Sequence, residues 1–148
     1  MIFAFDMDGT LASLYSVQGW LSALHSEDTT PYAVAAPMID MARVSRILNN
    51  LRSIGHEVHV ITWTAKGGSP EYNRKVAKVK KAWLNRYGFP YDEIHVLDYG
   101  VNKNIPVAHI SGKHILFDDS DEVLSTWNGI AVDVKTTDII GYLEKVAA

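Results

Sequence analysis

Residues 1–10, MIFAFDMDGT, are the stretch of the 148-residue sequence that decides the fold. Residues 2–6 form a short, mostly apolar run, which is typical of a strand buried on both faces of a parallel sheet. Asp6 and Asp8 end this run two residues apart, and Gly9 then permits a sharp backbone turn that a β-carbon would resist. A plain Asp-Gly turn produces the same pattern, so the pair indicates a site only if partners occur elsewhere.

Short apolar runs of the same kind alternate with helical periods along the rest of the chain. The further runs are residues 58–62, 94–97, 115–117 and 130–134. The helical periods are residues 38–54, which Gly55 ends, residues 70–87, which Ser69 and Pro70 begin, and residues 138–146. Their apolar stripes are Met41, Val44, Leu48 and Leu51 in the first, and Tyr72, Val76, Val79 and Trp83 in the second. Strands separated by helices predict a doubly wound, mainly parallel five-stranded α/β sheet.

Residues 11–37 fit this alternation poorly. Six side chains fit one face of a helix that ends near Ser26, namely Leu11, Leu14, Tyr15, Gln18, Leu21 and His25. Residues 26–37 have the composition of an irregular loop. We therefore expect one domain over residues 1–148, with residues 11–37 inserted after the first strand as a short cap over the strand ends.

Composition excludes several classes of function. The chain has no cysteine, which excludes disulfides, zinc–thiolate sites and cysteine nucleophiles and suits a reducing compartment. A formal net charge of -3 gives no overall field to attract nucleic acid or an anionic membrane. The sequence has no apolar run of membrane-spanning length and no basic leader before its first acidic residues. We expect a cytoplasmic protein with no membrane partner, and the charge disfavours nucleic acid as a partner; its oligomeric state stays open.

A second acidic pair ends another of the predicted strands. Asp118 and Asp119 follow the run 115–117, and Thr62 closes the run 58–62. Ligands of doubly wound sheets bind outside the carboxyl ends of the strands, so these side chains are expected to meet Asp6 and Asp8. Two converging acidic pairs repel each other unless a cation lies between them, and a site made only of oxygen atoms suits Mg²⁺. Capping of the following helix also explains the second pair, and both explanations can hold.

Together, Asp6-x-Asp8-Gly9-Thr10, Thr62, a downstream lysine and Asp118-Asp119 resemble the haloacid dehalogenase-like (HAD) phosphatase superfamily over almost the whole chain. The resemblance implies that Asp6 attacks phosphorus to form a phosphoaspartate, with Asp8 as general acid and then general base. It implies that the Thr62 hydroxyl holds a phosphoryl oxygen. It also implies a Mg²⁺ site made by Asp6, the backbone carbonyl of Asp8, Asp118 and Asp119.

The superfamily also uses a lysine to bridge the nucleophile and the phosphate. Lys103 lies in the interval between the third and fourth predicted strands and is our choice. Lys80 and Lys81 lie in the middle of a predicted amphipathic helix, where solvated lysines are usual. Lys113 stands directly before the fourth strand and is too close to it.

The segments at residues 60–67, 80–88 and 94–103 are similar to the 5′(3′)-deoxyribonucleotidase branch and to related phage and bacterial hydrolases. The insertion is shorter than the helical cap of that branch, so its contacts to the nucleobase do not transfer. We expect a phosphomonoesterase acting on a nucleoside monophosphate or another small phosphate ester. The alternatives are a phosphatase of nucleic-acid termini and a catalytically silent binding module.

The remaining expectations concern substrate contacts. We expect them from Gly9, Thr10, Thr62, Trp63, Lys66 and Trp20. Trp20 and Tyr32 suit stacking on a flat group or internal packing equally well, whereas Tyr15 is expected to pack in the core. Lys66 also fits a solvated loop lysine, and His25 a helix end or the surface. A row of basic side chains is expected on the solvated face of the helix at residues 70–87, namely Arg74, Lys75, Lys78 and Lys81.

Overall fold

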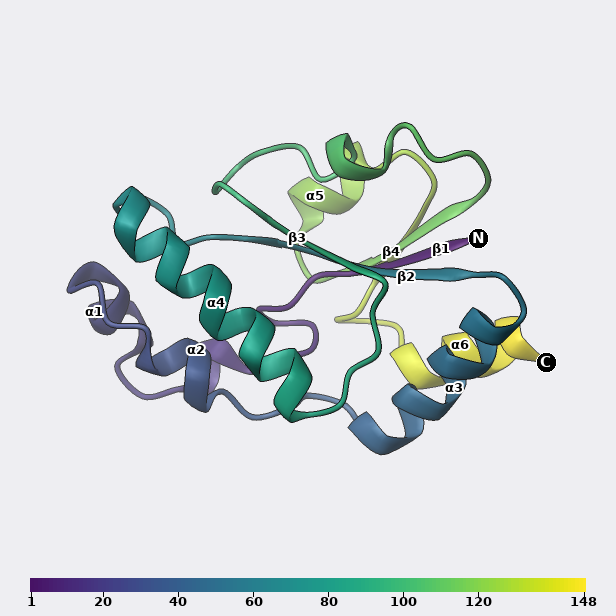
Figure 1. The fold of residues 1–148 in the computed structure, drawn as a ribbon, viewed down its shortest axis with the longest axis horizontal. Coiled ribbons are helices and arrows are strands. Elements are labelled where there is room, and N and C mark those ends of the chain that lie inside the picture. The colour runs from purple at the N-terminus through teal and green to yellow at the C-terminus, as the bar shows by residue number, and fades with distance from the viewer.

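The computed structural model describes all residues from Met1 to Ala148 and contains one five-stranded sheet. The strands lie in the order β3-β2-β1-β4-β5, and every neighbouring pair is parallel (Figure 1). Their bounds are β1 Ile2–Phe5, β2 Glu57–Trp63, β3 Glu93–Leu97, β4 His114–Asp118 and β5 Ile130–Asp133. This arrangement confirms the predicted doubly wound α/β sheet, and all five strands match the predicted runs closely.

Burial follows the position of each strand in the sheet. All four residues of β1 are buried, because β2 and β4 flank this central strand and helices or loops cover both faces. The two edge strands were wrongly expected to be buried on both faces: no residue of β3 is fully buried, and Ile130 of β5 is 43% exposed. Edge strands have a neighbour on one side only, and their apolar composition does not reveal that position.

Helices and loops cover the sheet on two sides (Figure 1). One face packs against α3 (Met41–Ser53), α4 (Pro70–Arg86) and α6 (Ile139–Ala147). The other face packs against α5 (Asp121–Thr126) and the short 3-10 helix η2 (Ile105–Val107). No helix of the structure combines the length and the apolar character that crossing a membrane requires.

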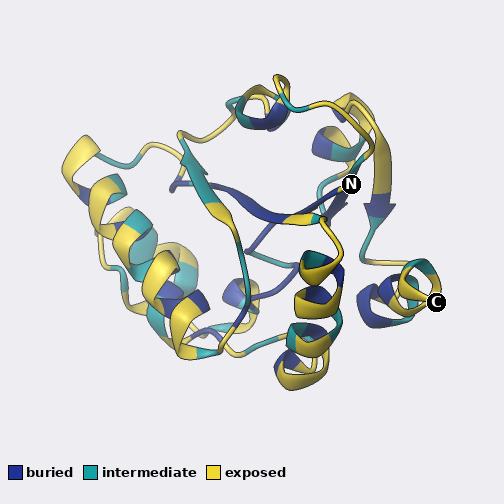
Figure 2. Cartoon of the chain, turned by 45° about the vertical axis from the view of Figure 1, so that its right-hand side comes forward, coloured by how far each residue is buried: buried dark blue, intermediate teal, exposed yellow.

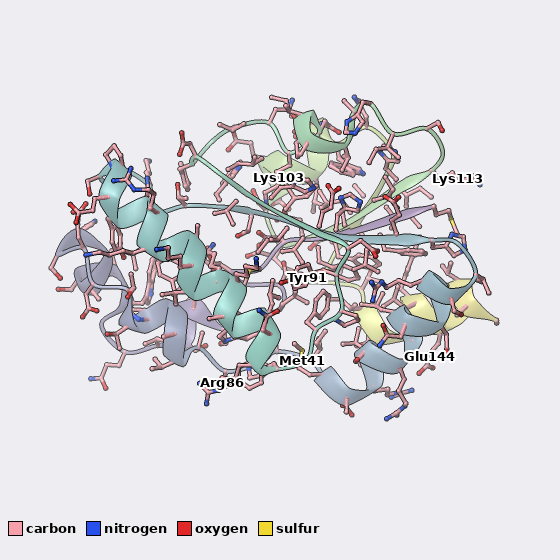
Figure 3. The ribbon with its side chains drawn as sticks, viewed as in Figure 1. Met41, Arg86, Tyr91, Lys103, Lys113 and Glu144 are labelled. Carbon is pink, nitrogen blue, oxygen red and sulfur yellow. The ribbon has the colours of Figure 1, made fainter.

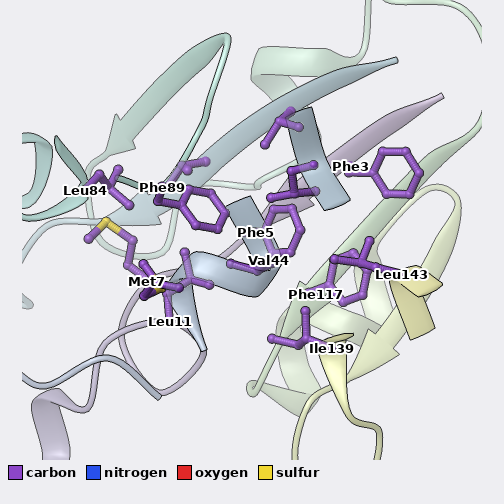
Figure 4. Close-up of a cluster of buried hydrophobic side chains, with 14 of the residues drawn as sticks. Phe3, Phe5, Met7, Leu11, Val44, Leu84, Phe89, Phe117, Ile139 and Leu143 are labelled. Atoms are coloured by element: carbon purple, nitrogen blue, oxygen red, sulfur yellow. The ribbon is translucent and has the colours of Figure 1, made fainter. Parts of the chain in front are cut away.

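The larger core cluster lies between the sheet and the three longer helices (Figure 4). Phe5 stacks on Phe117 at 4.6 Å between ring centroids and meets the edge of Phe89 at 5.3 Å. The predicted α3 stripe of Met41, Val44, Leu48 and Leu51 is buried in this cluster. Exposed residues occupy the outer sides of α3 and α4, and buried residues their sheet-facing sides (Figure 2).

The predicted helix boundaries agree with the observed ones because the capping residues act as expected. Ser69 Oγ accepts a hydrogen bond from the backbone N–H of Tyr72 at 3.1 Å at the start of α4. Gly55 follows α3 with φ +98°, the left-handed conformation that ends many helices. Asp40, Ser120 and Asp138 cap α3, α5 and α6 in the same way.

The 11–37 insertion differs from its expected structure. Instead of one helix ending near Ser26, it contains a 3-10 turn η1 (Leu14–Ser16) and a separate helix α1 (Trp20–His25). Gly19 separates them because it adopts φ +74°, which no right-handed helix contains. The segment expected to be irregular holds a further short helix, α2 (Thr30–Val34), whose first turn includes Pro31.

Hydrogen bonds join the insertion to α4. Tyr72 donates its hydroxyl to the backbone carbonyl of Asp28 at 2.9 Å, and Trp83 Nε1 donates to that of Ala35 at 2.8 Å. The carboxylate of Glu27 accepts bonds from the backbone N–H and hydroxyl of Ser69 at 2.8 and 2.9 Å. The insertion therefore lies beside α4, at the end of the sheet where β1 terminates (Figure 1).

Candidate active site

Asp6 directly follows the central strand and accepts a bond from a buried lysine. Lys103 Nζ lies 2.9 Å from Asp6 Oδ1 and 2.8 Å from Asp118 Oδ2, and only 4% of its side chain is exposed. Burial lowers the pKa of Lys103, but the charges of Asp6 and Asp118 outweigh it and raise that pKa overall. Lys113, by contrast, lies at the opposite end of the sheet, near the N-terminus (Figure 3).

Three carboxylates converge at this end of the sheet. Asp6, Asp118 and Asp119 each offer an oxygen atom, and these atoms lie within 4.8 Å of one another. Burial and the charges of Asp6 and Asp118 raise the pKa of Asp119 to about 7, and burial and Asp6 also raise that of Asp118. The cluster therefore holds more negative charge than Lys103 compensates, which suits a divalent cation bound by oxygen atoms.

The turn after Asp6 brings the chain against this cluster. Gly9 adopts φ +81°, and a β-carbon there would lie 2.2 Å from Asp119 Oδ2. The hydroxyl of Thr10 donates to Asp6 Oδ2 at 3.2 Å. Gly9 thus allows a close approach that no other residue permits, and Thr10 fixes the second oxygen of Asp6.

The carboxylate of Asp8 is separate from the acidic cluster. It accepts a bond from Lys80, whose Nζ lies 2.8 Å from Asp8 Oδ2, 2.7 Å from Thr62 Oγ1 and 2.7 Å from the Trp63 carbonyl oxygen. Burial and the charge of Asp6 raise the pKa of Asp8, and this effect exceeds the opposing one of Lys80. Of the residues expected at the metal, the side chain of Asp8 is therefore the one that points elsewhere.

Lys80 is one of two residues of this site that the sequence interpretation missed. It was assigned to the solvated part of the helix, yet it is 1% exposed and makes three hydrogen bonds. A signal was present, because Lys80 lies on the buried stripe at helical spacing from Tyr72, Val76 and Trp83. A lysine on an apolar stripe requires a buried acceptor, which the sequence alone does not identify.

The hydroxyl expected from Thr62 is not available to a ligand. Thr62 is fully buried and its oxygen accepts the bond from Lys80, since β2 continues one residue further to Trp63. Thr64 lies two residues later and lines the cavity at the strand ends. Its buried hydroxyl oxygen has no hydrogen-bond partner, so Thr64 is the threonine free to bind a substrate oxygen.

A cavity of about 350 Å³ opens above these groups. Its walls include Asp6, Asp8, Lys103, Asp118 and Asp119, together with Trp20, Trp63 and Lys66 from the expected substrate contacts. Gly9 and Thr10 do not line it. Instead, Thr10 bonds to the carboxylate of Asp6, and Gly9 leaves room for that of Asp119.

Aromatic side chains form much of the remaining wall. Tyr15 was expected in the core but is 53% exposed, and its ring meets that of Trp20 edge-on at 5.0 Å. Tyr15 lies in the 3-10 turn η1 and not in the predicted helix, so the helical stripe on which that expectation depended does not form. Trp63 packs against Tyr99 at 4.9 Å, and Lys66 Nζ lies 5.8 Å from the Tyr99 ring.

The other two uncertain side chains of the insertion also border the cavity. Tyr32 is 5% exposed and lies 5.1 Å below Lys80 Nζ, so internal packing dominates at this residue. His25 lies at the end of α1, as expected, and contributes to the cavity wall. The basic residues of α4 are exposed, as predicted, namely Arg74, Lys75, Lys78 and Lys81.

Comparisons with known proteins support the fold. No model of a protein family matches the sequence, and neither does any curated protein. One similar solved structure is a chain of the Pnkp1/Rnl/Hen1 RNA repair complex, with a TM-score of 0.58 and 18% identity. The match covers 89% of the present chain but 41% of that one, so the present chain spans about two fifths of its length.

A second similar structure is the D,D-heptose 1,7-bisphosphate phosphatase of Burkholderia thailandensis. It has a TM-score of 0.51 and 12% identity, and the match covers 84% of the present chain and 69% of the phosphatase. At such identities both likenesses establish the fold, an all-parallel α/β sheet of the Rossmann-like type.

Proposed function

We propose that this chain is a Mg²⁺-dependent phosphomonoesterase that forms a phosphoaspartate on Asp6. The observation that carries the proposal is that two neighbouring aspartates have different surroundings. Asp6 lies within the acidic cluster with one oxygen on Lys103, whereas Asp8 is held outside the cluster by Lys80. Both line one cavity, so a single bound phosphate ester can contact a nucleophile and a proton donor.

In the first step an oxygen of Asp6 attacks phosphorus, and the bond between phosphorus and the ester oxygen breaks. Asp8, in its protonated form, gives its proton to the leaving oxygen, which departs as an alcohol. The raised pKa of Asp8 favours this protonated form. Lys103 and the Thr64 hydroxyl are near enough to the cavity to stabilise the oxygens of the transferring group.

In the second step a water molecule attacks the phosphoaspartate. Asp8, now a carboxylate, takes a proton from that water, and the bond between phosphorus and Asp6 breaks. The products are inorganic phosphate and the free carboxylate of Asp6. The balance over both steps is one ester and one water converted to one alcohol and one phosphate.

The residues present fit a Mg²⁺ ion. Asp6, Asp118 and Asp119 supply carboxylate oxygens, and Gly9 leaves room beside Asp119 that a side chain would fill. When bound, Mg²⁺ supplies positive charge to the phosphoryl oxygens and lowers the repulsion between them and Asp6. We retain the backbone carbonyl of Asp8 as a further proposed ligand.

A nucleoside monophosphate is the first candidate substrate. The resemblance to the deoxyribonucleotidase branch suggests this class, and the aromatic wall of Tyr15, Trp20 and Tyr99 offers flat surfaces for a base. The cavity is also large enough for other small phosphate esters, since ligand pockets start at about 300 Å³.

A phosphatase of nucleic-acid termini is the second candidate. It is supported by the structural likeness to a chain of an RNA repair complex and by the exposed Lys66 and Tyr99 at the cavity. Both side chains suit a strand whose end enters the cavity, because stacking and phosphate contacts suffice for single strands.

Phosphate release tests the proposal directly. The purified chain is assayed with and without Mg²⁺ on nucleoside monophosphates, sugar phosphates and end-phosphorylated oligonucleotides. Asp6→Asn should abolish release, whereas the matched change Asp121→Asn, at an exposed aspartate outside the cavity, should leave it unchanged. Acid-quenched reactions should contain phosphate bound covalently to wild-type protein.

The outcomes separate the hypotheses. Full activity without a divalent ion, or in Asp6→Asn, would refute the mechanism. Release from oligonucleotides alone would move the second candidate to first place. No release from any substrate would favour a silent binding module.

A further inference from the structure

A second group of potential metal ligands lies on β2 and β3, away from the cavity. His59 is the third residue of β2, and Glu93 and His95 are the first and third residues of β3. The register pairs His59 with Glu93 and Ile61 with His95, so all three side chains occupy one face of the sheet. None of them lines the active-site cavity, and none has a role in the proposed phosphatase.

The distances within this group match one face of a metal tetrahedron. His59 Nδ1 and His95 Nε2 are 3.0 Å apart, and Glu93 Oε2 lies 3.3 Å from His95 Nε2 and 3.9 Å from His59 Nδ1. Zinc bonds of about 2.0–2.2 Å place neighbouring ligand atoms of a tetrahedral site about 3.3–3.6 Å apart. The three atoms therefore need to move by only fractions of an ångström to share one ion.

The hydrogen bonding of His59 leaves the correct nitrogen available. Its Nε2 lies 2.8 Å from Glu57 Oε2, and a carboxylate can only accept, so Nε2 carries the proton. In the neutral ring Nδ1 then carries a lone pair, which accepts a hydrogen bond from His95 Nε2 at 3.0 Å; loss of that proton from His95 would leave both nitrogens able to bind one ion. A carboxylate behind a histidine is the arrangement that orients and strengthens histidine ligands in known metal sites.

Burial and charge also suit a metal. His59 is 1% exposed, and the only cationic groups within ion-pairing distance of Glu57 and Glu93 are the two histidines.

We infer that His59, His95 and Glu93 form a binding site for a Zn²⁺ ion, with Glu57 as the hydrogen-bond partner of His59. Two imidazoles and one carboxylate suit Zn²⁺ rather than Mg²⁺, which prefers oxygen ligands throughout. The fourth position of the tetrahedron is open to solvent on the side of the partly exposed His95 and Glu93.

The structural consequence concerns the edge strand. β3 has one strand neighbour, β2, and an ion held by both strands ties the first half of β3 to the sheet. The residues that follow β3 include Tyr99 and Lys103, so the same ion holds the strand from which these side chains enter the cavity. The inference does not depend on the reaction proposed above.

The test measures zinc binding to the full chain. Chelator-treated protein receives excess Mg²⁺, which fills the acidic cluster, and then Zn²⁺. We expect one zinc per chain after gel filtration, and Co²⁺ in place of Zn²⁺ should give the visible absorption of a tetrahedral site. At a free Zn²⁺ concentration about 100-fold above Kd, the Tm should rise by roughly 5–10 °C.

Matched variants locate the ion. His95→Gln and Glu93→Gln should each lower zinc affinity at least tenfold, whereas Asp119→Asn and the exposed Glu122→Gln should retain it. Glu93 is exposed, so its variant reports on binding even if His95→Gln fails to fold. Absence of bound zinc, equal affinity in Glu93→Gln, or loss of binding only in Asp119→Asn would overturn the inference.

Discussion

Lys80 holds a positive charge where solvent does not reach it. An ammonium group in such a position is costly to bury. Three acceptors at 2.7–2.8 Å satisfy its three N–H donors. One of these acceptors is Asp8, so the same contact that satisfies Lys80 also orients the proposed acid and base. The position of Asp8 is thus set by α4, whereas its raised pKa comes mainly from burial.

Replacing Lys80 by Met should therefore affect both stability and turnover. The change leaves Asp8 without its cation, and breaking a buried ion pair on one side costs about 3–5 kcal/mol of unfolding free energy. We expect kcat to fall by roughly 10–100-fold, because Asp8 loses its fixed orientation. Chemical denaturation and phosphate release measure the two effects.

The neighbouring lysine provides the control for this change. Lys81 is exposed on the same helix, so Lys81→Met should change neither quantity appreciably. If Lys80→Met unfolds no more easily than Lys81→Met, the buried contacts assigned to Lys80 are wrong.

Thr64 offers a sharper test of the cavity. Its hydroxyl has no partner within the protein, so Thr64→Val removes a donor without leaving another protein group unpaired. We expect kcat/KM to fall by about 10–150-fold with unchanged stability, because a hydrogen bond to a charged oxygen is worth about 1.5–3 kcal/mol. Thr64→Ser should restore most of the activity, and a fully active valine variant would exclude Thr64 from the site.

At the scale of elements, Asp92 joins three segments in front of β3. Its Oδ1 accepts from the Arg52 guanidinium of α3 at 2.8 Å, and its Oδ2 from the N–H of Val58 in β2 at 2.8 Å. Burial alone would raise the pKa of Asp92, but the bonds from Arg52 and Val58 outweigh it and lower that pKa.

A lowered pKa in the folded state gives a defined pH dependence. The unfolded chain binds this proton more readily, so the contribution of Asp92 is present above its ordinary pKa and is lost as pH falls through the folded value. We expect Asp92→Asn to lower the free energy of unfolding by roughly 1 kcal/mol near neutrality and by less in acid. The effect is small because the side chains of Arg52 and Asp92 are each about one-third exposed. Denaturation curves between about pH 6 and pH 2 measure the difference. The exposed variant Glu71→Gln should leave that pH profile unchanged.

The elements divide clearly into those that sequence reveals and those that it does not. The buried strands and the capped helices follow from periodicity and local hydrogen bonding, so β1, α3 and α4 were predicted with nearly correct ends. The insertion was not, because its course depends on a left-handed Gly19 and on contacts to α4 that lie far along the chain.

The same division applies within the site. Asp6 and Asp118 were expected to meet because strand ends of a parallel sheet lie at one edge, and Lys103 was chosen from the family resemblance; the structure brings the three together. Lys80 and Thr64 were missed because their roles depend on which side chains meet in three dimensions. A threonine two residues earlier matches the same sequence pattern, and only the extent of β2 separates the two.

Over the whole molecule, the 11–37 insertion is fastened to α4 by four hydrogen bonds at three points. The bond from Tyr72 to Asp28 lies between those at Ser69 and Trp83. Tyr72→Phe removes that bond and should lower stability by about 0.5–1.5 kcal/mol. Because the other two attachments remain, we expect KM to change less than threefold. Denaturation and steady-state kinetics check this pair of results.

A larger change in KM would mean that the insertion moves. A Tyr72→Phe variant with a KM raised tenfold or more would indicate a segment that opens and closes on its hydrogen bonds. The variant Tyr87→Phe, at the far end of the same helix, serves as the comparison.

We expect an insertion that is attached at several points along a helix to stay in place, so that the opening of the cavity does not change. The opening of the cavity beside Tyr15 and Tyr99 would then keep one width. The proposed phosphatase would select substrates by their size before the reaction begins. Under the proposed function, slender phosphate esters should then react faster than bulky ones that bind the acidic cluster equally well. Larger substrates would then become accessible through replacement of the aromatic side chains at the opening by smaller ones, one position at a time.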